Sequence, residues 1–186
     1  FTPTAEIPFA GHPNVGTAFV LARQGEVFGR PVGPTMRFEE RAGIVEVDLL
    51  REGGTVVGAR IRAPRPLEVG PEIDAGTIAA CASLAIEDLV AGRHAPLVAS
   101  VGLPFAFAEL ASLDALARAV PNAAAFAVAN RAYPHADDAF ALFLYVPDAA
   151  DPSRIRARMF APLSNVPEDP ATGSASAALG ALLAAL

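Results

Sequence analysis

Apolar and polar positions alternate in several stretches of the chain. Between residues 45 and 49 the apolar Val45, Val47 and Leu49 alternate with Glu46 and Asp48, a period of two that is typical of a strand with one buried face. The following Gly53–Gly54 predicts a hairpin turn that leads into a second strand near residues 55–61. Three arginines alternate with apolar residues over 154–159 and predict a further half-exposed strand.

Other segments have the marks of helices. Pro13 suits a first helical position, because its missing N–H would have no partner there, and Gly25 is a typical stop. Ser112 is a suitable N-cap for a short helix. The uncharged stretch 172–186 predicts a helix buried on every side. The predicted helices are 13–24, 73–90, 112–120 and 172–186, and the remaining predicted strands are 95–110, 124–130 and 139–147.

The order of these elements predicts an α+β protein with two similar halves, residues 1–95 and 96–186. Residues 1–20 align without gaps on residues 160–179, so that Phe1 meets Phe160 and Pro8 meets Pro167. Each copy predicts a short extended segment, a turn marked by proline, and a helix start rich in small residues. We interpret the match as an internal duplication.

Composition narrows the class of protein. The chain has 186 residues, of which 53% are hydrophobic and 18% charged, so it can form a sizeable core. A net charge of -6 argues against a nucleic-acid partner. The sequence shows neither a signal peptide nor an apolar stretch of about 20 residues, so we expect no membrane association and a cytoplasmic location. The single Cys81 excludes an internal disulfide and is expected in the core.

The two helix starts are the candidate site. The first N–H groups of a helix have no partner within it and lie at the positive end of its dipole, so they attract anions. His12 lies at one start and Asp169 just before the other. Histidine passes protons near neutral pH, and Ser174 could donate to a carboxylate. We therefore predict proton-transfer chemistry on a small organic acid.

Simpler interpretations stay open for each residue. His12 could be a solvent-exposed side chain at a helix cap, Asp169 could serve turn and capping chemistry, and the small residues after Thr172 could serve only packing. His94 and His135 lie in polar loop sequence and are expected at the surface. No G-x-S-x-G elbow, phosphate-binding loop, dinucleotide fingerprint or cluster of metal ligands occurs, so neither a hydrolase triad nor a metal is expected.

Three long motifs carry a family resemblance: "FTPTAEIPFAGHPNVGTAFVL", "SVGLPFAFAEL" and "RMFAPLSNVPEDPATGSASAALGALL". They resemble the PhzF-like family of phenazine biosynthesis along nearly the whole chain. The resemblance implies a diaminopimelate-epimerase-like fold, in which two pseudo-symmetric halves each wrap a curled mixed or antiparallel sheet around a central helix. The active site of such proteins lies in the cleft at the two helix N-termini.

The resemblance also implies a function. The best-known member isomerises dihydro-3-hydroxyanthranilate, needs no cofactor and is a homodimer, so we expect an isomerase acting on a small carboxylate-bearing cyclic amino or hydroxy acid. His12 and Asp169 match active-site polar residues. Gly11, Gly173 and Ser174 match substrate-contacting positions. The two cysteines used by the related epimerases are missing, which disfavours cysteine-based racemisation.

One departure from the family pattern shapes the expectation of activity. The principal acid/base of the family is a glutamate upstream of the "FTP" motif, and the family continues beyond the second central helix. We therefore expect this chain to be a fragment truncated at both ends, inactive alone and prone to aggregate through exposed sheet edges. A non-catalytic homologue that binds small acids, and an amino-acid epimerase, remain alternative hypotheses.

Overall fold

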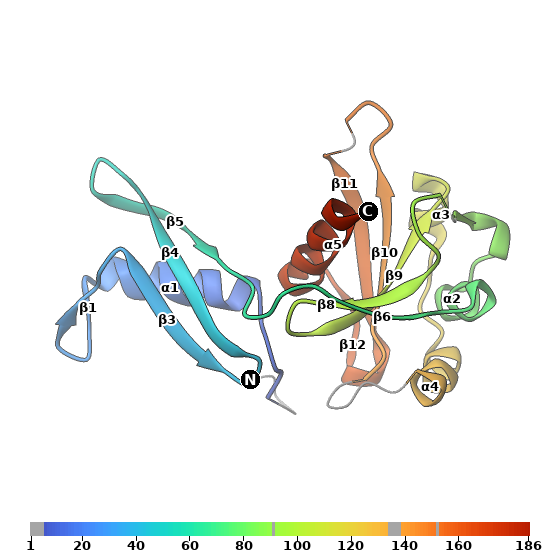
Figure 1. Ribbon diagram of the computed structural model, residues 1–186, viewed down its shortest axis with the longest axis horizontal. Helices are drawn as coiled ribbons and strands as arrows, with labels where there is room; N and C mark the ends of the chain where they lie inside the picture. The colour runs from blue at the N-terminus through green and yellow to red at the C-terminus, as the bar shows by residue number, and fades with distance from the viewer. Residues whose placement is uncertain (1–5, 91, 134–138, 152) are drawn as a thin grey trace. The chain divides into compact units, whose positions relative to one another are not determined.

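The computed structural model describes residues 6–90, 92–133, 139–151 and 153–186. The chain forms two compact units (Figure 1). Unit 1 comprises Phe1–Pro66, Val101–Leu103 and Thr172–Ala177, and unit 2 comprises Leu67–Ser100, Pro104–Ala171 and Ala178–Leu186. The units follow contacts in space, whereas the predicted halves 1–95 and 96–186 follow a sequence repeat, so the division at residue 95 stays a prediction.

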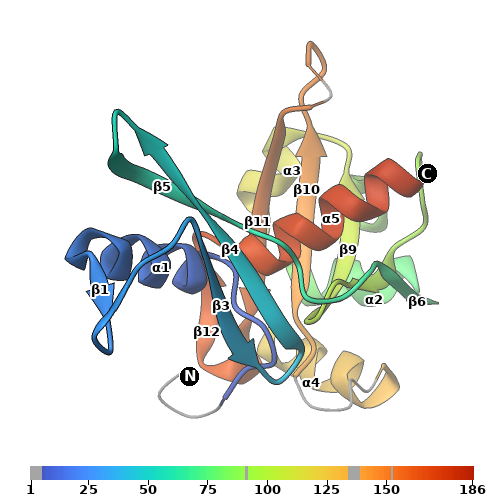
Figure 2. The same ribbon diagram turned by 60° about the vertical axis from the view of Figure 1, so that its left-hand side comes forward.

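Unit 1 is built from one helix on a three-stranded antiparallel sheet. Helix α1 packs against β4 and β5 (Figure 2), and the sheet order is β3-β4-β5. Val45, Val47 and Leu49 are buried, as their alternation predicts, because one face of the sheet turns toward the helix. The elements are α1 (His12–Gln24), β1 (Glu26–Val27), β2 (Arg30–Pro31), β3 (Thr35–Glu40), β4 (Gly43–Glu52) and β5 (Thr55–Ile61).

Unit 2 is built on a seven-stranded sheet with the order β12-β11-β10-β9-β8-β6 and β7 beside β9. Strands β9 and β10 are parallel and the other pairs antiparallel. The strands are β6 (Glu68–Glu72), β7 (Leu89–Val90), β8 (Leu97–Ser100), β9 (Pro104–Leu110), β10 (Leu142–Pro147), β11 (Ile155–Ala161) and β12 (Val166–Asp169). The helices of this unit are α2 (Ala75–Ala82), α3 (Leu113–Arg118), α4 (Ala123–Ala132) and the later turns of α5 (Gly173–Ala185).

The core of unit 2 lies between the sheet and helices α2, α3 and α4. Phe126 and Phe140 meet edge to face at its centre, and Phe160 joins them from β11. The part of α5 that follows Ala178 covers the opposite face of this sheet (Figures 1 and 2). Both faces of the sheet are therefore occupied, which explains the nearly continuous burial along β9 and β10.

Two predicted elements differ in the structure. The helix predicted over 73–90 ends at Ala82, where Ser83 adopts a left-handed backbone, and Ile86–Asp88 forms a separate 3₁₀ turn. Residues 124–130, predicted as a strand, form part of helix α4, because the Asn122 side chain accepts from two backbone N–H groups at its start.

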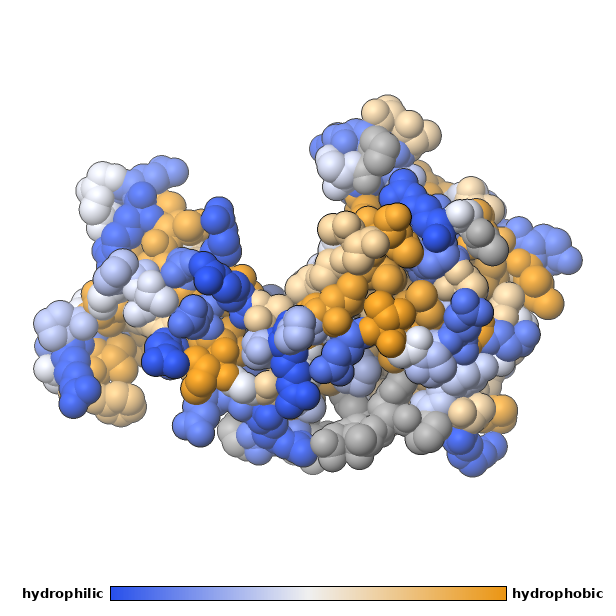
Figure 3. All heavy atoms as spheres, viewed as in Figure 1, coloured by the Kyte–Doolittle hydropathy of each residue, from blue (hydrophilic) through white to orange (hydrophobic). Residues whose placement is uncertain are grey.

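Helix α5 is not buried on every side. Ser174, Ala175, Ala178, Leu179 and Leu182 are buried, but Ser176 and Gly180 are exposed. Apolar residues also show at the surface over the end of this helix (Figure 3). The absence of charge in its sequence therefore reflects small and apolar residues on both faces rather than complete burial.

Other predicted elements are confirmed. Helix α1 carries Pro13 in its first turn and ends at Gly25, whose φ of 85° is left-handed. Gly53 and Gly54 both have positive φ in the β4–β5 turn, and Ser112 caps α3 by accepting from the Ala115 N–H. The extended segment predicted for residues 1–8, and the paired Phe1 of the repeat, fall largely outside the described residues.

Candidate functional site

The segment before α1 is fixed by the turn between β3 and β4. The Ala42 N–H donates to the Pro8 carbonyl at 2.9 Å, and the Ala10 N–H donates to Oε2 of Glu40 at 3.3 Å. Phe9, between these two anchors, is fully buried. This arrangement sets the place at which the chain turns into Gly11 and helix α1.

Helix α1 begins at His12, whose side chain is exposed, whereas Gly11 before it is buried. The Asn14 side chain donates to the Ala10 carbonyl at 2.7 Å and is itself buried. Because Pro13 has no N–H, the backbone donors at this helix start belong to His12 and Asn14. An exposed imidazole therefore stands beside backbone N–H groups that the helix leaves without a partner.

The starts of α1 and α5 meet within unit 1. A Cβ atom added to Gly11 would lie 2.7 Å from the backbone of Gly173 and from the Ser174 nitrogen. A Cβ atom added to Gly173 would lie 3.0 Å from the His12 nitrogen. A Cβ at position 11 cannot fit without a shift of backbone, and one at position 173 requires the neighbouring backbone to give by a few tenths of an ångström, so both positions favour glycine on steric grounds. The backbones at the starts of α1 and α5 therefore lie against each other at Gly11, His12, Gly173 and Ser174, while the assignment of these residues to an active site stays a prediction.

Ser174 lies in the first turn of α5 and is only 5% exposed. Among the described residues, no hydrogen-bond partner is found for its hydroxyl. The neighbouring Ser176 hydroxyl, in contrast, donates to the Thr172 carbonyl at 2.9 Å. A buried hydroxyl without a partner costs about 1–3 kcal/mol, and such groups in folded proteins call for an explanation. A bound acceptor group would supply one.

Asp169 ends strand β12 in unit 2, where it is half-buried and pairs with Met159 of β11. The preceding Glu168 forms a bidentate ion pair with Arg158, and both N···O distances are 2.7 Å. The hydrogen bonds from Arg158 hold the pKa of Glu168 below its ordinary value. Of the two acidic residues in the "EDP" motif, Glu168 is thus engaged by a cation of its own unit. The pairing of His12 with Asp169 stays a prediction.

A buried polar chain in unit 2 was missed by sequence reasoning. His94 was expected at the surface, but it is only 8% exposed, and its Nε2 lies 2.7 Å from the Tyr145 hydroxyl. Tyr145 in turn donates to Glu109 at 3.2 Å. Burial, reinforced by the Glu109 carboxylate, raises the pKa of Tyr145. The residues next to His94 in the sequence are polar, and its partners Tyr145 and Glu109 lie far away along the chain. Only the folded structure therefore reveals these partners. His135 lies outside the described residues.

Cys81 is buried in α2, as the sequence predicts. Burial raises the pKa of its thiol from 9.0 to about 12, so it is neither a nucleophile nor a metal ligand at neutral pH. Across the described part of the chain, no three His, Cys, Asp or Glu side chains gather into a group that could hold a metal ion. Nor does any helix in those described ranges have the length and apolar character needed to span a membrane.

A sequence model of the phenazine biosynthesis-like (PhzC-PhzF) family matches residues 1–186. The chain belongs to this family. An uncharacterized isomerase of Mesorhizobium japonicum is 34% identical over 98% of this chain and 60% of its own length. The trans-2,3-dihydro-3-hydroxyanthranilate isomerase of Pseudomonas fluorescens is 32% identical over 99% of this chain and 58% of its own length. The chain thus spans about three fifths of these PhzF-family relatives.

The fold is also that of the family. The crystal structure of a PhzF-family protein from Bacillus anthracis superimposes with a TM-score of 0.77 over 97% of this chain and 58% of that chain, at 22% identity. The predicted family and the predicted α+β fold of that family are therefore confirmed. Substrate, cofactor independence, homodimer assembly, cytoplasmic location and the roles of the site residues stay predictions.

Proposed function

We propose that this PhzF-family protein is an isomerase that moves a proton on a small cyclic amino or hydroxy acid. The substrate carboxylate would bind where α1 and α5 begin, at Gly11, Gly173 and Ser174. The substrate of the Pseudomonas fluorescens relative, trans-2,3-dihydro-3-hydroxyanthranilate, is such a molecule and is the first compound to test.

The buried hydroxyl of Ser174 is the observation that carries this proposal. Ser174 directly follows Gly173, whose backbone lies against that of Gly11, and its hydroxyl has no hydrogen-bond partner among the described residues. A carboxylate bound beside this contact would accept from the Ser174 hydroxyl and from N–H groups of the two helix starts. One anion would thereby satisfy several donors that the protein leaves open.

His12 and Asp169 are assigned the proton-handling roles. His12 is exposed at the start of α1 and so can reach a bound molecule, and an imidazole accepts or donates a proton near neutral pH. Asp169 precedes the start of α5 by a few residues and would orient a substrate hydroxyl or amine. A positioned acid or base contributes about 10²–10⁴-fold in rate. No metal or organic cofactor is required for this chemistry.

The test is a comparison of turnover and binding in the natural full-length protein. Isomerisation of trans-2,3-dihydro-3-hydroxyanthranilate, and C–H exchange in D₂O by NMR, would be followed for wild type, His12→Gln and Asp169→Asn. We expect turnover to fall about 10²-fold or more in each variant, with substrate affinity nearly unchanged. Gln24→Ala, at the far end of α1, is the control and should match wild type.

Other outcomes would identify the alternatives. Exchange accompanied by inversion of a stereocentre would favour an amino-acid epimerase. Binding of the same acids by calorimetry without any exchange would favour a non-catalytic homologue. Wild-type turnover in both His12→Gln and Asp169→Asn would refute the site assignment.

A further inference from the structure

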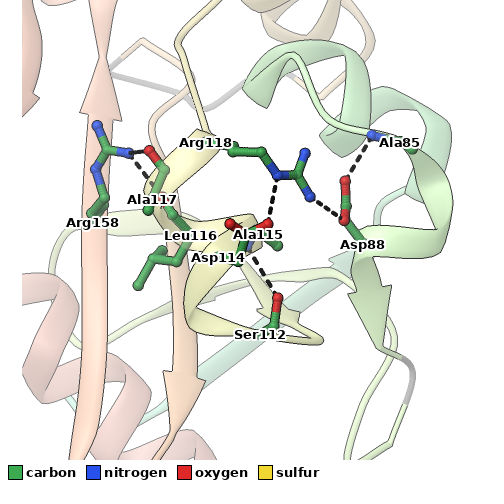
Figure 4. Close-up of polar contacts among 9 residues, drawn as sticks. All are labelled: Ala85, Asp88, Ser112, Asp114, Ala115, Leu116, Ala117, Arg118 and Arg158. Carbon is green, nitrogen blue, oxygen red and sulfur yellow. Dashed lines mark hydrogen bonds and ion pairs between the residues drawn. The ribbon is translucent and has the colours of Figure 1, made fainter.

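Arg158 of β11 uses every nitrogen of its guanidinium group within unit 2. Nε and Nη2 donate to the two carboxylate oxygens of Glu168, each at 2.7 Å. Nη1 donates to carbonyls at the end of α3, those of Leu116 at 2.8 Å and Ala119 at 2.9 Å. The guanidinium carbon also lies 4.9 Å from the centre of the Phe160 ring. One side chain therefore ties together β11, β12 and the last turn of α3, part of which Figure 4 shows.

This contact holds a short strand at the edge of the sheet. Strand β12 forms one edge of the sheet and has only four residues. Its pairing with β11 joins Met159 to Asp169 and Ala161 to Val166, with a shift of register between them. Pro167 within the strand has no N–H to donate. A bidentate arginine is rigid, because both of its donors must stay in line with both carboxylate oxygens.

Strand geometry connects the ion pair to Asp169. Successive side chains of a strand point to opposite faces, so Glu168 turns toward Arg158 and Asp169 turns the other way. Fixing Glu168 therefore fixes the pleat from which the Asp169 carboxylate projects. The same short strand leads through Pro170 into the start of α5.

We propose that Arg158 is a positioning residue that sets the place of Asp169 through its bidentate ion pair with Glu168. This inference rests on the proposed function, because it requires that Asp169 take part in proton transfer. A displacement of about 1 Å at a reacting group can cost about 10²-fold in rate. Loss of this ion pair should accordingly lower kcat by about 10-fold or more, while the substrate affinity stays within a few-fold of wild type.

The natural full-length protein allows a direct test with four variants. Arg158→Gln removes the ion pair, Arg158→Lys keeps the charge but cannot form the bidentate pair, and Glu168→Gln removes the charge from the other partner. Arg118→Gln is a matched control, because Arg118 also pairs with two carboxylates of unit 2, Asp88 and Asp114, but does not touch β12 (Figure 4). Each variant is assayed for isomerisation of trans-2,3-dihydro-3-hydroxyanthranilate well below its melting temperature.

The decisive readout is the effect of Arg158→Gln when Asp169 is already Asn. A positioning role predicts that the fall in kcat seen in wild type disappears in this background. A purely structural role predicts the same fall in both backgrounds, or a lower melting temperature with unchanged kcat, and either result would overturn the inference. Arg118→Gln should keep kcat within about twofold of wild type, as surface ion pairs contribute little.

The two proposals fail in different ways. Wild-type kcat in Asp169→Asn, or an inactive wild type, would refute both the proposed function and this inference. A large fall in kcat in Asp169→Asn, combined with wild-type kcat in Arg158→Gln and Glu168→Gln, would refute only the inference about Arg158. If Arg158→Gln does not fold, Glu168→Gln and Arg158→Lys provide the same comparison in both backgrounds.

Discussion

Nε2 of His94 lies 2.7 Å from the hydroxyl oxygen of Tyr145, 51 residues away along the chain. The other ring nitrogen, Nδ1, lies 2.7 Å from the Ala95 carbonyl oxygen. The Tyr145 hydroxyl continues the chain to Glu109. This buried polar chain links the loop before β8 to strands β9 and β10, and its members depend on one another for hydrogen bonds.

Removing the Tyr145 hydroxyl should destabilise the protein. Tyr145→Phe leaves the His94 nitrogen and the Glu109 carboxylate without their shared partner, which should lower the free energy of unfolding by about 1–3 kcal/mol. Urea unfolding monitored by circular dichroism would measure the loss. Tyr133→Phe is the control, because the Tyr133 hydroxyl accepts one exposed bond, from the Asp74 N–H. Equal losses in the two variants would contradict the account.

Gly11→Ala should disrupt the junction of the two helix starts. The new Cβ would lie 2.7 Å from the backbone of Gly173, and backbone cannot move aside cheaply, so we expect a loss of about 1–3 kcal/mol and weaker carboxylate binding. Gly16→Ala is the matched control in the same helix, since a Cβ there meets nothing within 4 Å. It should stabilise the protein by about 0.5–1 kcal/mol. Chemical unfolding and calorimetric titration would measure both effects.

The second helix offers the same comparison. Gly173→Ala should be harmful and Gly180→Ala harmless, because only the Cβ at 173 meets backbone, at 3.0 Å. A Gly11→Ala or Gly173→Ala protein as stable and as active as its control would show that the close approach is not required.

Cys81 should make the protein less stable at high pH. Burial raises the pKa of the thiol from 9.0 to about 12, so the unfolded chain releases this proton first. The contribution of this thiol to the free energy of unfolding is complete below about pH 9 and is lost as the pH rises toward 12. The loss amounts to about 2 kcal/mol at pH 10.5. The urea midpoint should therefore fall further between pH 8 and pH 10.5 for wild type than for Cys81→Ala. Identical falls would refute this expectation, as would rapid reaction of Cys81 with a thiol reagent at pH 8.

Glu168 should make the protein less stable at low pH. Its pKa is held below the ordinary 4.5, first by the hydrogen bonds from Arg158, so its contribution is present above about pH 4.5 and is lost as the pH falls through the lower value. Because the side chain is 41% exposed, we expect about 1 kcal/mol at most. Melting temperatures between pH 6 and 3 should change less in Glu168→Gln than in wild type. Glu87→Gln, an exposed control, should follow the wild-type curve.

Much of the local structure follows from the sequence. Pro13 and Gly25 mark the ends of α1, the alternation around Val47 gives β4, and Ser112 caps α3, because each of these signals acts within a few residues. The error over α4 has the same local origin. Alanine, phenylalanine and valine over 124–130 are compatible with helix or strand, and the Asn122 cap decides between them.

The sequence by itself determined the family, the α+β class, and two helix starts rich in small residues with His12 and Asp169 nearby. Only the tertiary structure decided that Gly11 meets the backbone of Gly173, that the Ser174 hydroxyl is buried, and that Arg158 forms a bidentate ion pair with Glu168. It also decided that His94 is buried against Tyr145. Motifs and capping signals depend on neighbours in sequence, and so can be recognised there. Close approaches depend on how distant elements pack, and no local pattern of residues encodes which of them will meet.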